Sequence, residues 1–167
     1  MTIGFRPLTE SDVSLVERWL REEHVALWWR EPVEEAIEKR VAGIEGLRPT
    51  RQFVIAVDGR PAGMIQTYLV SDHPDWDAVV RVGEGVAGVD LMIGEPDLVG
   101  AGLGPQVLCA FVRDVVFADP SVQTVVATVV EANRRSWRAF EKAGFRHVRD
   151  VEEDGLPHRL MRLDRPV

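Results

Sequence analysis

The sequence predicts an α/β (α+β) fold in which a mixed, mostly antiparallel central sheet of about seven strands is flanked by about four helices. Its 167 residues match the usual size of one domain, and 46% of them are hydrophobic, a typical globular proportion. Runs rich in β-branched residues alternate with stretches in which apolar residues recur every three or four positions. A strand, a glycine-rich loop, a helix and a further strand follow one another, which is the pattern of a βαβ unit. We therefore expect one domain over residues 1–167.

The first half of the chain predicts a strand, two helices and a hairpin. Trp19 lies on the apolar stripe of the first helix, and residues 9–12 supply capping side chains for it. Pro32 suits the first turn of the second helix, and Asp58-Gly59 favours a tight turn between two strands. The expected elements are a strand over residues 2–8, a helix after residue 12, a helix over about 32–45, strands over 53–57 and 62–70, and an irregular acidic loop over 71–84.

The second half predicts the βαβ unit, a final helix and a final hairpin. Residues 122–130 form the most β-branched stretch of the chain, and Gly144 is a natural C-terminal helix cap. Cys109 falls in the apolar stripe of the helix after the glycine loop, so we expect it to pack in the core. The expected elements are a strand over Val86–Ile93, a helix over about 102–118, a strand over 122–130, a helix over about 133–143, and two strands flanking Asp154-Gly155.

The charge balance excludes several classes of function. The chain has 20 Lys and Arg against 27 Asp and Glu, a net charge of −7, which argues against non-specific binding to nucleic acid or anionic membranes. Such a negative field attracts cationic substrates. Cys109 is the only cysteine, so neither an intramolecular disulfide nor a cysteine-based zinc site is expected. Because no apolar run is long enough for a membrane span and no export signal is present, we expect a cytoplasmic protein.

A glycine-rich loop is the most informative feature for chemistry. It reads Val99-Gly100-Ala101-Gly102-Leu103-Gly104-Pro105, follows a predicted strand and opens a predicted helix. Backbone N–H groups and the helix dipole at such a place hold phosphate groups well. Glycine-rich turns also form for steric reasons alone, so a phosphate site and a purely steric turn both stay open.

The spacing Val99-x-x-Gly102-x-Gly104 and the two segments 133–136 and 140–145 give the chain a resemblance to the GNAT family of acyl-CoA-dependent N-acyltransferases. The spacing Val99-x-x-Gly102-x-Gly104 resembles the Arg/Gln-x-x-Gly-x-Gly/Ala phosphate loop of that family. Residues 133–136 and 140–145 resemble the family signature Asn-x-x-Ala/Ser … Tyr-x-Lys-x-Gly-Phe. Nearly the whole chain resembles the aminoglycoside 6′-N-acetyltransferases of that family, and the matching positions are Trp19-Leu20, His24, Trp28-Trp29, Gly63, Gln66, Tyr68, Gly88-Val89-Asp90, Gly102-Leu103-Gly104 and Phe117-x-Asp119-Pro120.

The resemblance implies a GNAT fold, acetyl-CoA (coenzyme A) as the acyl donor, and a primary amine of a cationic small molecule, most directly the 6′-amine of an aminoglycoside, as the acceptor. Asp90 matches the proposed general base of those enzymes, and no metal, nucleic acid or membrane is implied; a monomer or homodimer is expected. The implied cofactor-binding residues are Leu91, Met92, Ile93, Val99, Gly100, Ala101, Gly102, Leu103, Gly104, Pro105, Asn133, Ser136 and Phe140. The implied acceptor-binding residues are Trp28, Trp29, Gln66, Tyr68, Asp75, Trp76, Asp90 and Thr128.

The chemistry of acyl transfer suits these positions. A protonated amine cannot attack a thioester, and Asp90, at the end of a central strand, is suited to anchor the ammonium and take its proton. Backbone N–H groups of residues 91–93 would polarise the thioester carbonyl if the strand splays there as in the family. Phe140 stands where many family members have a Tyr that protonates the leaving thiolate. Thr128 stands where close relatives have an aspartate, which leaves either a weaker acceptor affinity or a substitution by Glu131.

Alternatives stay open at several positions. Trp28 and Trp29 suit the core or a wall of the acceptor cleft, and Gln66 and Tyr68 suit a cleft or a solvated face of the sheet. His24 suits a surface or capping role. The acidic loop suits a polyamine acceptor or solubility alone. The alternative functions are an N-acyltransferase for a lysine-derived siderophore precursor, and a non-catalytic acyl-CoA sensor.

Overall fold

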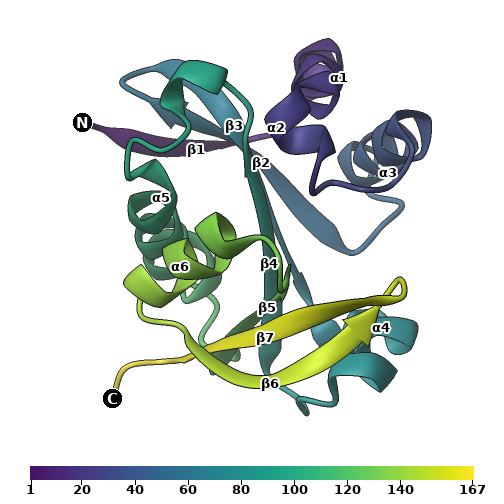
Figure 1. Cartoon of the computed structure of the whole chain (residues 1–167), viewed down its shortest axis with the longest axis vertical. Coiled ribbons are helices and arrows are strands. Elements are labelled where there is room, and N and C mark those ends of the chain that lie inside the picture. Colours follow the sequence, from purple (N-terminus) through teal and green to yellow (C-terminus); the bar gives the residue numbers. More distant parts are fainter. The chain divides into compact units, whose positions relative to one another are not determined.

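The computed structural model describes residues 1–167, and the chain divides into two compact units (Figure 1). Unit 1 comprises residues 1–67 and 90–101, and unit 2 comprises residues 68–89 and 102–167. The hydrogen-bonded strand order is β1-β2-β3-β4-β5-β7-β6, and strands β3 and β4 contribute residues to both units. Strands β4 and β5 pair in parallel, whereas β1 with β2, β5 with β7 and β6 with β7 pair antiparallel. The predicted mixed, mostly antiparallel sheet of seven strands is therefore confirmed.

Unit 1 packs two helices over its strands. Figure 1 shows α1 and α3 side by side, and Trp19 of α1 lies fully buried in an apolar cluster with Ala36, Val54, Met64 and Met92. Asp58-Gly59 turns the hairpin between β2 and β3 with positive φ at both residues, as predicted. The elements of this unit are β1 (Ile3–Pro7), α1 (Val13–Arg21), α2 (Glu23–Ala26), α3 (Val33–Ile44), β2 (Thr50–Val57), most of β3 (Arg60–Leu69) and the second half of β4 (Val86–Ile93).

Unit 2 has its own apolar cluster, formed by Val70, Val80, Val86, Val126 and Leu160. Helices α5 and α6 of unit 2 lie side by side (Figure 1). The elements of this unit are α4 (Pro74–Val80), the first half of β4, α5 (Leu103–Phe111), β5 (Thr124–Val130), α6 (Arg134–Lys142), β6 (Arg146–Glu153) and β7 (Leu156–Asp164). None of the helices in either unit is both long enough and apolar enough to cross a bilayer.

The structure corrects the predicted number of helices, the predicted irregular loop and the predicted place of Cys109. It has six α-helices instead of about four, because α2 is only about one turn long and α4 lies inside the segment predicted as an irregular loop. Pro74 begins α4, and the acidic residues Asp75 and Asp77 lie in its first turn, where they suit the helix dipole. Helix α5 ends at Phe111, and a π-helical turn over Val112–Val116 follows it directly. Cys109 is exposed, so its predicted place in the core is wrong; the buried face of α5 carries Leu103, Val107, Leu108 and Phe111 instead.

A buried carboxylate in unit 1 predicts a loss of stability in acid. Asp12 accepts two hydrogen bonds from the Arg6 guanidinium, both 2.8 Å long, and a third from the Thr9 backbone N–H at 2.9 Å. The hydrogen bonds from Arg6 are the main cause that lowers the pKa of Asp12 to about 2. Because the unfolded carboxyl has a pKa of about 3.9, the stabilisation is complete above that pH and is lost as the pH falls towards 2.

We expect Asp12→Asn to lower the free energy of unfolding by about 1–2 kcal/mol at pH 7, because the neutral amide loses the paired charge. Urea unfolding at pH 7 and at pH 2.5 checks this, with the difference between variant and parent shrinking at the lower pH. A difference that is the same at both pH values would show that the ionised form of Asp12 is not what stabilises the fold.

Candidate active site

A carboxylate and an amide are joined by a hydrogen bond in unit 1. Asp90 is half-buried on β4, and Gln66 is 8% exposed on β3. The Gln66 amide donates from Nε2 to Asp90 Oδ2 at 3.0 Å. This bond fixes the orientation of the amide, and its other polar atom, the buried Oε1, has no hydrogen-bond partner. The pair therefore offers a negatively charged acceptor and an unused neutral acceptor, which suits a ligand with several N–H donors.

Two tryptophans follow α2 in unit 1, and both are half-buried. Trp29 packs against the apolar cluster of this unit and donates from Nε1 to Glu31 at 3.2 Å. Its ring also faces a cation, since the Arg40 guanidinium lies 5.9 Å from the ring centre. Trp29 is therefore partly core, and its indole N–H is already engaged. For Trp28 the structure shows only partial burial.

Arg40 is a buried charged residue that the sequence analysis did not single out. It is only 3% exposed, and it lies on helix α3. Burial holds the pKa of Arg40 below its usual range, and the negative charges of Glu31 and Asp90 act in the opposite direction. The signal was present in the sequence, because Arg40 follows Ala36 by four residues and so falls on the buried side of the helix.

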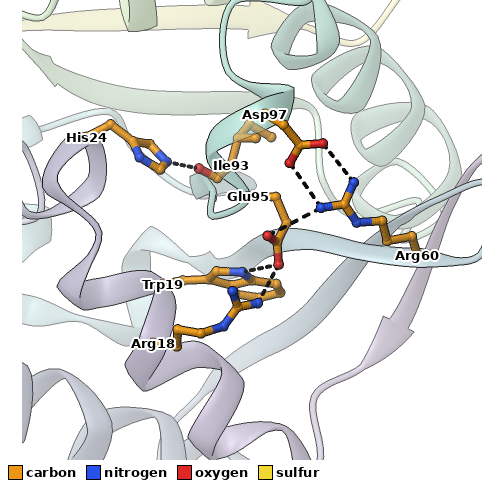
Figure 2. Close-up of polar contacts among 7 residues, drawn as sticks. All are labelled: Arg18, Trp19, His24, Arg60, Ile93, Glu95 and Asp97. Carbon is orange, nitrogen blue, oxygen red and sulfur yellow. Dashed lines mark hydrogen bonds and ion pairs between the residues drawn. The ribbon is translucent and has the colours of Figure 1, made fainter.

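A histidine side chain contacts the end of β4 (Figure 2). The ring of His24 donates from Nε2 to the Ile93 carbonyl at 2.8 Å. The backbone N–H groups of Gly94 and Glu95 both donate to the carbonyl of Ala62, at 2.8 and 3.1 Å. His24 is thus half-buried and bonded to the strand end, in a role closer to the predicted cap than to a free surface residue.

A buried carboxylate holds the segment that leads into the glycine loop. Glu95 accepts hydrogen bonds from Trp19 Nε1 at 3.0 Å, Arg18 at 2.6 Å and Arg60 at 3.4 Å (Figure 2). The bond from the Trp19 indole is the main cause that lowers the pKa of Glu95, followed by the bond from Arg18. Arg60 also makes two hydrogen bonds to Asp97, at 2.9 and 3.0 Å. Residues 94–97 are therefore tied to α1 and β3 of the same unit.

The residues predicted to hold the thioester lie just before this segment. Leu91 and Ile93 are half-buried and Met92 is buried. Gly63 on β3 allows the backbone at Met92 to come close, because a Cβ at position 63 would lie 2.1 Å from the Met92 carbonyl oxygen. The close approach requires glycine at this position.

The glycine loop is divided between the units. Val99, Gly100 and Ala101 end unit 1, and Gly102 caps the N-terminus of α5 in unit 2 with φ of +74°. Gly100 and Gly102 are exposed, and a Cβ on either would meet no atom within 4 Å. Gly104 differs, because its Cβ would lie 3.3 Å from the Ala139 side chain of α6. The packing of α5 against Ala139 therefore accounts for glycine at position 104, whereas Gly100 and Gly102 leave open space beside their backbone. In the first turn of α5, Leu103 is buried and Pro105 is half-buried.

The second motif forms a helix start and a core contact in unit 2. Asn133 caps α6, and its side-chain oxygen accepts from the Ser136 backbone N–H at 3.3 Å. Phe140 is buried, with its ring edge-on to Phe145 at 5.0 Å between centres. Within unit 2, Asn133, Ser136 and Phe140 therefore make contacts that stabilise the fold.

The remaining predicted acceptor residues lie in unit 2. Tyr68 and Trp76 both pack against the apolar cluster of that unit. The Tyr68 ring fills the space above Gly88, since a Cβ at position 88 would lie 2.4 Å from Tyr68 Cζ. The Trp76 indole N–H is buried without a partner, whereas Asp75 is exposed in the first turn of α4.

Thr128, which stands where close relatives have an aspartate, is hydrogen-bonded to a carboxylate. Thr128 donates from its hydroxyl to Glu153 Oε2 at 3.0 Å. Substitution of the missing aspartate by Glu131 was one of two open alternatives, the other being a weaker acceptor affinity; Glu131 is paired with the Arg159 guanidinium through bonds of 2.8 and 3.1 Å. The negative charge nearest Thr128 by contact is therefore that of Glu153, which the sequence reasoning did not single out.

Comparison with known proteins agrees with this architecture. A family model described as an acetyltransferase (GNAT) domain matches residues 9–153. The aminoglycoside N(6′)-acetyltransferase type 1 of Klebsiella pneumoniae is 26% identical over 149 residues, which cover 86% of this chain and 74% of that protein. The N(6)-hydroxylysine O-acetyltransferase of Escherichia coli is 24% identical over 161 residues, covering 92% of this chain and 48% of that protein.

Solved structures give the same result. The aminoglycoside acetyltransferase AAC(6′)-Ib in complex with parmomycin and acetyl-CoA superposes with a TM-score of 0.88 at 26% identity, covering 99% of this chain and 94% of that chain. The spermidine N-acetyltransferase of Vibrio cholerae, in complex with CoA and spermine, has a TM-score of 0.72 at 14% identity, covering 97% of this chain and 95% of that chain; it shares the fold alone. With a family model spanning most of its length, the chain belongs to the GNAT acetyltransferase family.

Proposed function

We propose that the protein transfers the acetyl group of acetyl-CoA to a primary amine of a cationic small molecule, most directly the 6′-amine of an aminoglycoside. The observation that carries the proposal is the Asp90–Gln66 pair, in which a carboxylate stands beside a buried amide oxygen without a partner. An ammonium group supplies the N–H donors and the positive charge that such a pair needs. The similarity to aminoglycoside N(6′)-acetyltransferases, one of them in complex with acetyl-CoA, supports the choice of donor and acceptor.

The proposed roles of the chain follow from the chemistry of amines. Asp90 anchors the ammonium and accepts one proton from it, so that the nitrogen gains a free electron pair. Gln66 Oε1 accepts a hydrogen bond from another N–H group of the amine, and this bond orients the free electron pair of the nitrogen. Acetyl-CoA, when bound, would supply the thioester: the nitrogen bonds to the acyl carbon, the carbon–sulfur bond breaks, the nitrogen loses its second proton, and the leaving thiolate takes up one proton in return. Positioning and electrostatics, with no covalent enzyme intermediate, account for the rate.

The cofactor is proposed to bind along the glycine loop and the end of β4. Exposed backbone at Gly100 and Gly102 leaves room for phosphate groups beside the N-terminus of α5. The N–H groups of Leu91 to Ile93 are proposed to face the thioester, and the other predicted cofactor residues are Val99, Ala101, Leu103, Gly104, Pro105, Asn133, Ser136 and Phe140. The proposed acceptor residues, in addition to Gln66 and Asp90, are Trp28, Trp29, Tyr68, Asp75, Trp76 and Thr128.

A second candidate is acylation of a lysine-derived acceptor. The similarity to an N(6)-hydroxylysine O-acetyltransferase over 92% of this chain favours it. The two candidates share the donor and Asp90 and differ only in the acceptor. For either candidate we propose one catalytic domain over residues 1–167 that acts in the cytoplasm, and for the first a role in antibiotic resistance.

Identification of the product tests the acceptor. The enzyme is incubated with acetyl-CoA and an aminoglycoside that carries a 6′-amine, and the product is analysed by mass spectrometry and NMR. We expect one added acetyl group, on the 6′-nitrogen. Acetylation of another amine would overturn the regiochemistry, and acetylation of lysine derivatives alone would favour the second candidate.

The Phe140 position predicts how the thiolate leaves. Phe140 has no proton to donate, so the thiolate of this enzyme leaves unassisted or with a proton from water. An ordinary thiol has a pKa of about 8.5, so its thiolate is a weak enough base to leave without a proton donor. We expect Phe140→Tyr to leave kcat equal or to raise it, as measured by thiol release from acetyl-CoA. Loss of turnover in a folded variant would show that the leaving-group site lies elsewhere.

A further inference from the structure

The side-chain contacts in Figure 2 gather on the segment between the end of β4 and the glycine loop. Glu95 is only 8% exposed, and its Oε1 accepts hydrogen bonds from Trp19 at 3.0 Å and Arg18 at 2.6 Å, both on α1. Its Oε2 accepts a third bond, from Arg60 of β3, at 3.4 Å. Arg60 also donates to both carboxylate oxygens of Asp97, at 2.9 and 3.0 Å. Side chains therefore tie this segment to a helix and to a strand of unit 1.

The backbone of the same segment is fixed as well. The N–H groups of Gly94 and Glu95 both donate to the Ala62 carbonyl of β3, at 2.8 and 3.1 Å. One turn later, the N–H of Leu98 donates to the Glu95 carbonyl at 3.1 Å. Residues 94–98 are therefore held by main-chain bonds in addition to the bonds of the Glu95 side chain.

The hydrogen-bonding pattern changes where the glycine loop begins. The N–H groups of Gly100 and Ala101 donate to no group of the protein, and both residues are exposed. Gly100 has φ of +79°, and a Cβ there would meet no atom within 4 Å. Successive backbone N–H groups at such turns bind anions when their directions are fixed. These two unused donors follow directly after the segment that the Glu95 contacts hold.

We propose that Glu95 is a positioning residue for the cofactor: with Arg60 and Asp97 it fixes the direction in which the N–H groups of residues 100 and 101 point, so that they meet the phosphate groups of CoA without further ordering. The proposal rests on the proposed function, since it takes CoA as the ligand of the glycine loop. Glu95 is buried and acts through the backbone, with no contact to the cofactor. A loop that is ordered before binding does not lose that conformational freedom when the ligand binds, so the affinity is higher.

The charge of the two carboxylates separates positioning from simple electrostatics. The phosphate groups of CoA are negative, and so are Glu95 and Asp97. By charge alone, removal of either carboxylate strengthens the binding of an anion nearby, because a repulsion is lost. If the carboxylates position the loop, their removal weakens binding in spite of that gain. The direction of the change in CoA affinity therefore distinguishes the two roles.

Calorimetry tests the proposal by measuring the Kd of CoA for the parent protein and its variants, with no acceptor and no turnover required. Glu95→Gln keeps the size of the side chain but loses the charge that Arg18 and Arg60 contact. Asp97→Ala removes the exposed partner of Arg60 and serves as the test if Glu95→Gln does not fold. Thermal unfolding gives the stability of each variant.

Asp12→Asn is the matched control. Asp12 is also a buried carboxylate of unit 1, but its hydrogen bonds come from Arg6 and Thr9 and none from residues 94–101. The substitution removes one negative charge and weakens a buried network, as Glu95→Gln does, without touching the segment before the glycine loop. A loss of CoA affinity that follows from lower stability alone would appear in this variant too.

We expect Glu95→Gln to raise the Kd of CoA about tenfold and Asp97→Ala about threefold, while Asp12→Asn stays within about twofold of the parent. Unchanged or tighter CoA binding by Glu95→Gln, or an equal weakening by Asp12→Asn, would overturn the positioning role. A parent that binds CoA but acetylates no amine would refute the proposed function, while the Kd values would still decide the role of Glu95. A parent that does not bind CoA would overturn both.

Discussion

Replacement of Asp90 by Asn is expected to lower kcat by two to four orders of magnitude at neutral pH, because general base catalysis contributes about 10²–10⁴ to a rate. The Asn side chain keeps the shape of Asp90 and an oxygen for the bond from Gln66 Nε2, but it can neither hold the ammonium by charge nor accept its proton. The affinity for CoA is expected to stay unchanged. Thiol release and calorimetry with CoA measure the two quantities.

Asp58→Asn is the matched control for this substitution. Asp58 is an exposed residue of the β2–β3 turn in the same unit, with a positive φ that Asn tolerates. We expect this variant to keep parental turnover. If Asp90→Asn also kept turnover within about threefold, well short of that contribution, the proton would have to leave by another route and Asp90 would not be the base. If the parent itself bound CoA and acetylated no amine, the acyl-CoA sensor would be the better description.

Substitution of Gly94 by Ala is expected to cause a large loss of stability. A Cβ at position 94 would lie 2.1 Å from Cγ of Trp19. That indole is wholly buried and is held by its hydrogen bond to Glu95, so it cannot move aside without giving up both its packing and that bond. Overpacking of this kind costs about 3 kcal/mol or more. For a chain of this size the melting temperature should fall by about 6–12 °C.

Gly4→Ala is the control for the glycine substitution. Gly4 lies on β1 of the same unit, and a Cβ there would meet nothing within 4 Å. We expect the free energy of unfolding of this variant to stay within about 0.5 kcal/mol of the parent. Urea unfolding of both variants checks the pair. A Gly94→Ala protein as stable as Gly4→Ala would show that Trp19 and the Glu95 network are looser than the structure indicates.

The sequence predicts best where the signal is local. Strand β4 has the predicted bounds, because a β-branched run ends in glycine on both sides. The Asp58-Gly59 turn and the Asn133 cap also follow from short-range chemistry. The segment over residues 71–84 contains α4 instead of the predicted irregular loop. Its acidic composition favours a loop, whereas Pro74 suits the first turn of a helix.

Partners far apart in the sequence could not be predicted from spacing. Trp19 and Glu95 are 76 residues apart and bond only because α1 and the segment after β4 meet in unit 1. Likewise, the spacing does not predict that Glu131, a candidate to replace the missing aspartate, is paired with Arg159, which lies 28 residues further along the chain. Asp90 and Gln66 were both predicted as site residues from the resemblance, whereas the hydrogen bond between them and the unused amide oxygen come from the fold.

Thiol release from acetyl-CoA, measured with two aminoglycosides that differ only in a 6′-amine or a 6′-hydroxyl, tests the central claim most directly. The pair isolates the group that Asp90 and Gln66 are proposed to hold while leaving the rest of the acceptor unchanged. We predict saturable thiol release with the amine and only the background rate with the hydroxyl compound. Equal rates with both compounds, or none with either while CoA still binds, would contradict a 6′-amine acetyltransferase centred on Asp90.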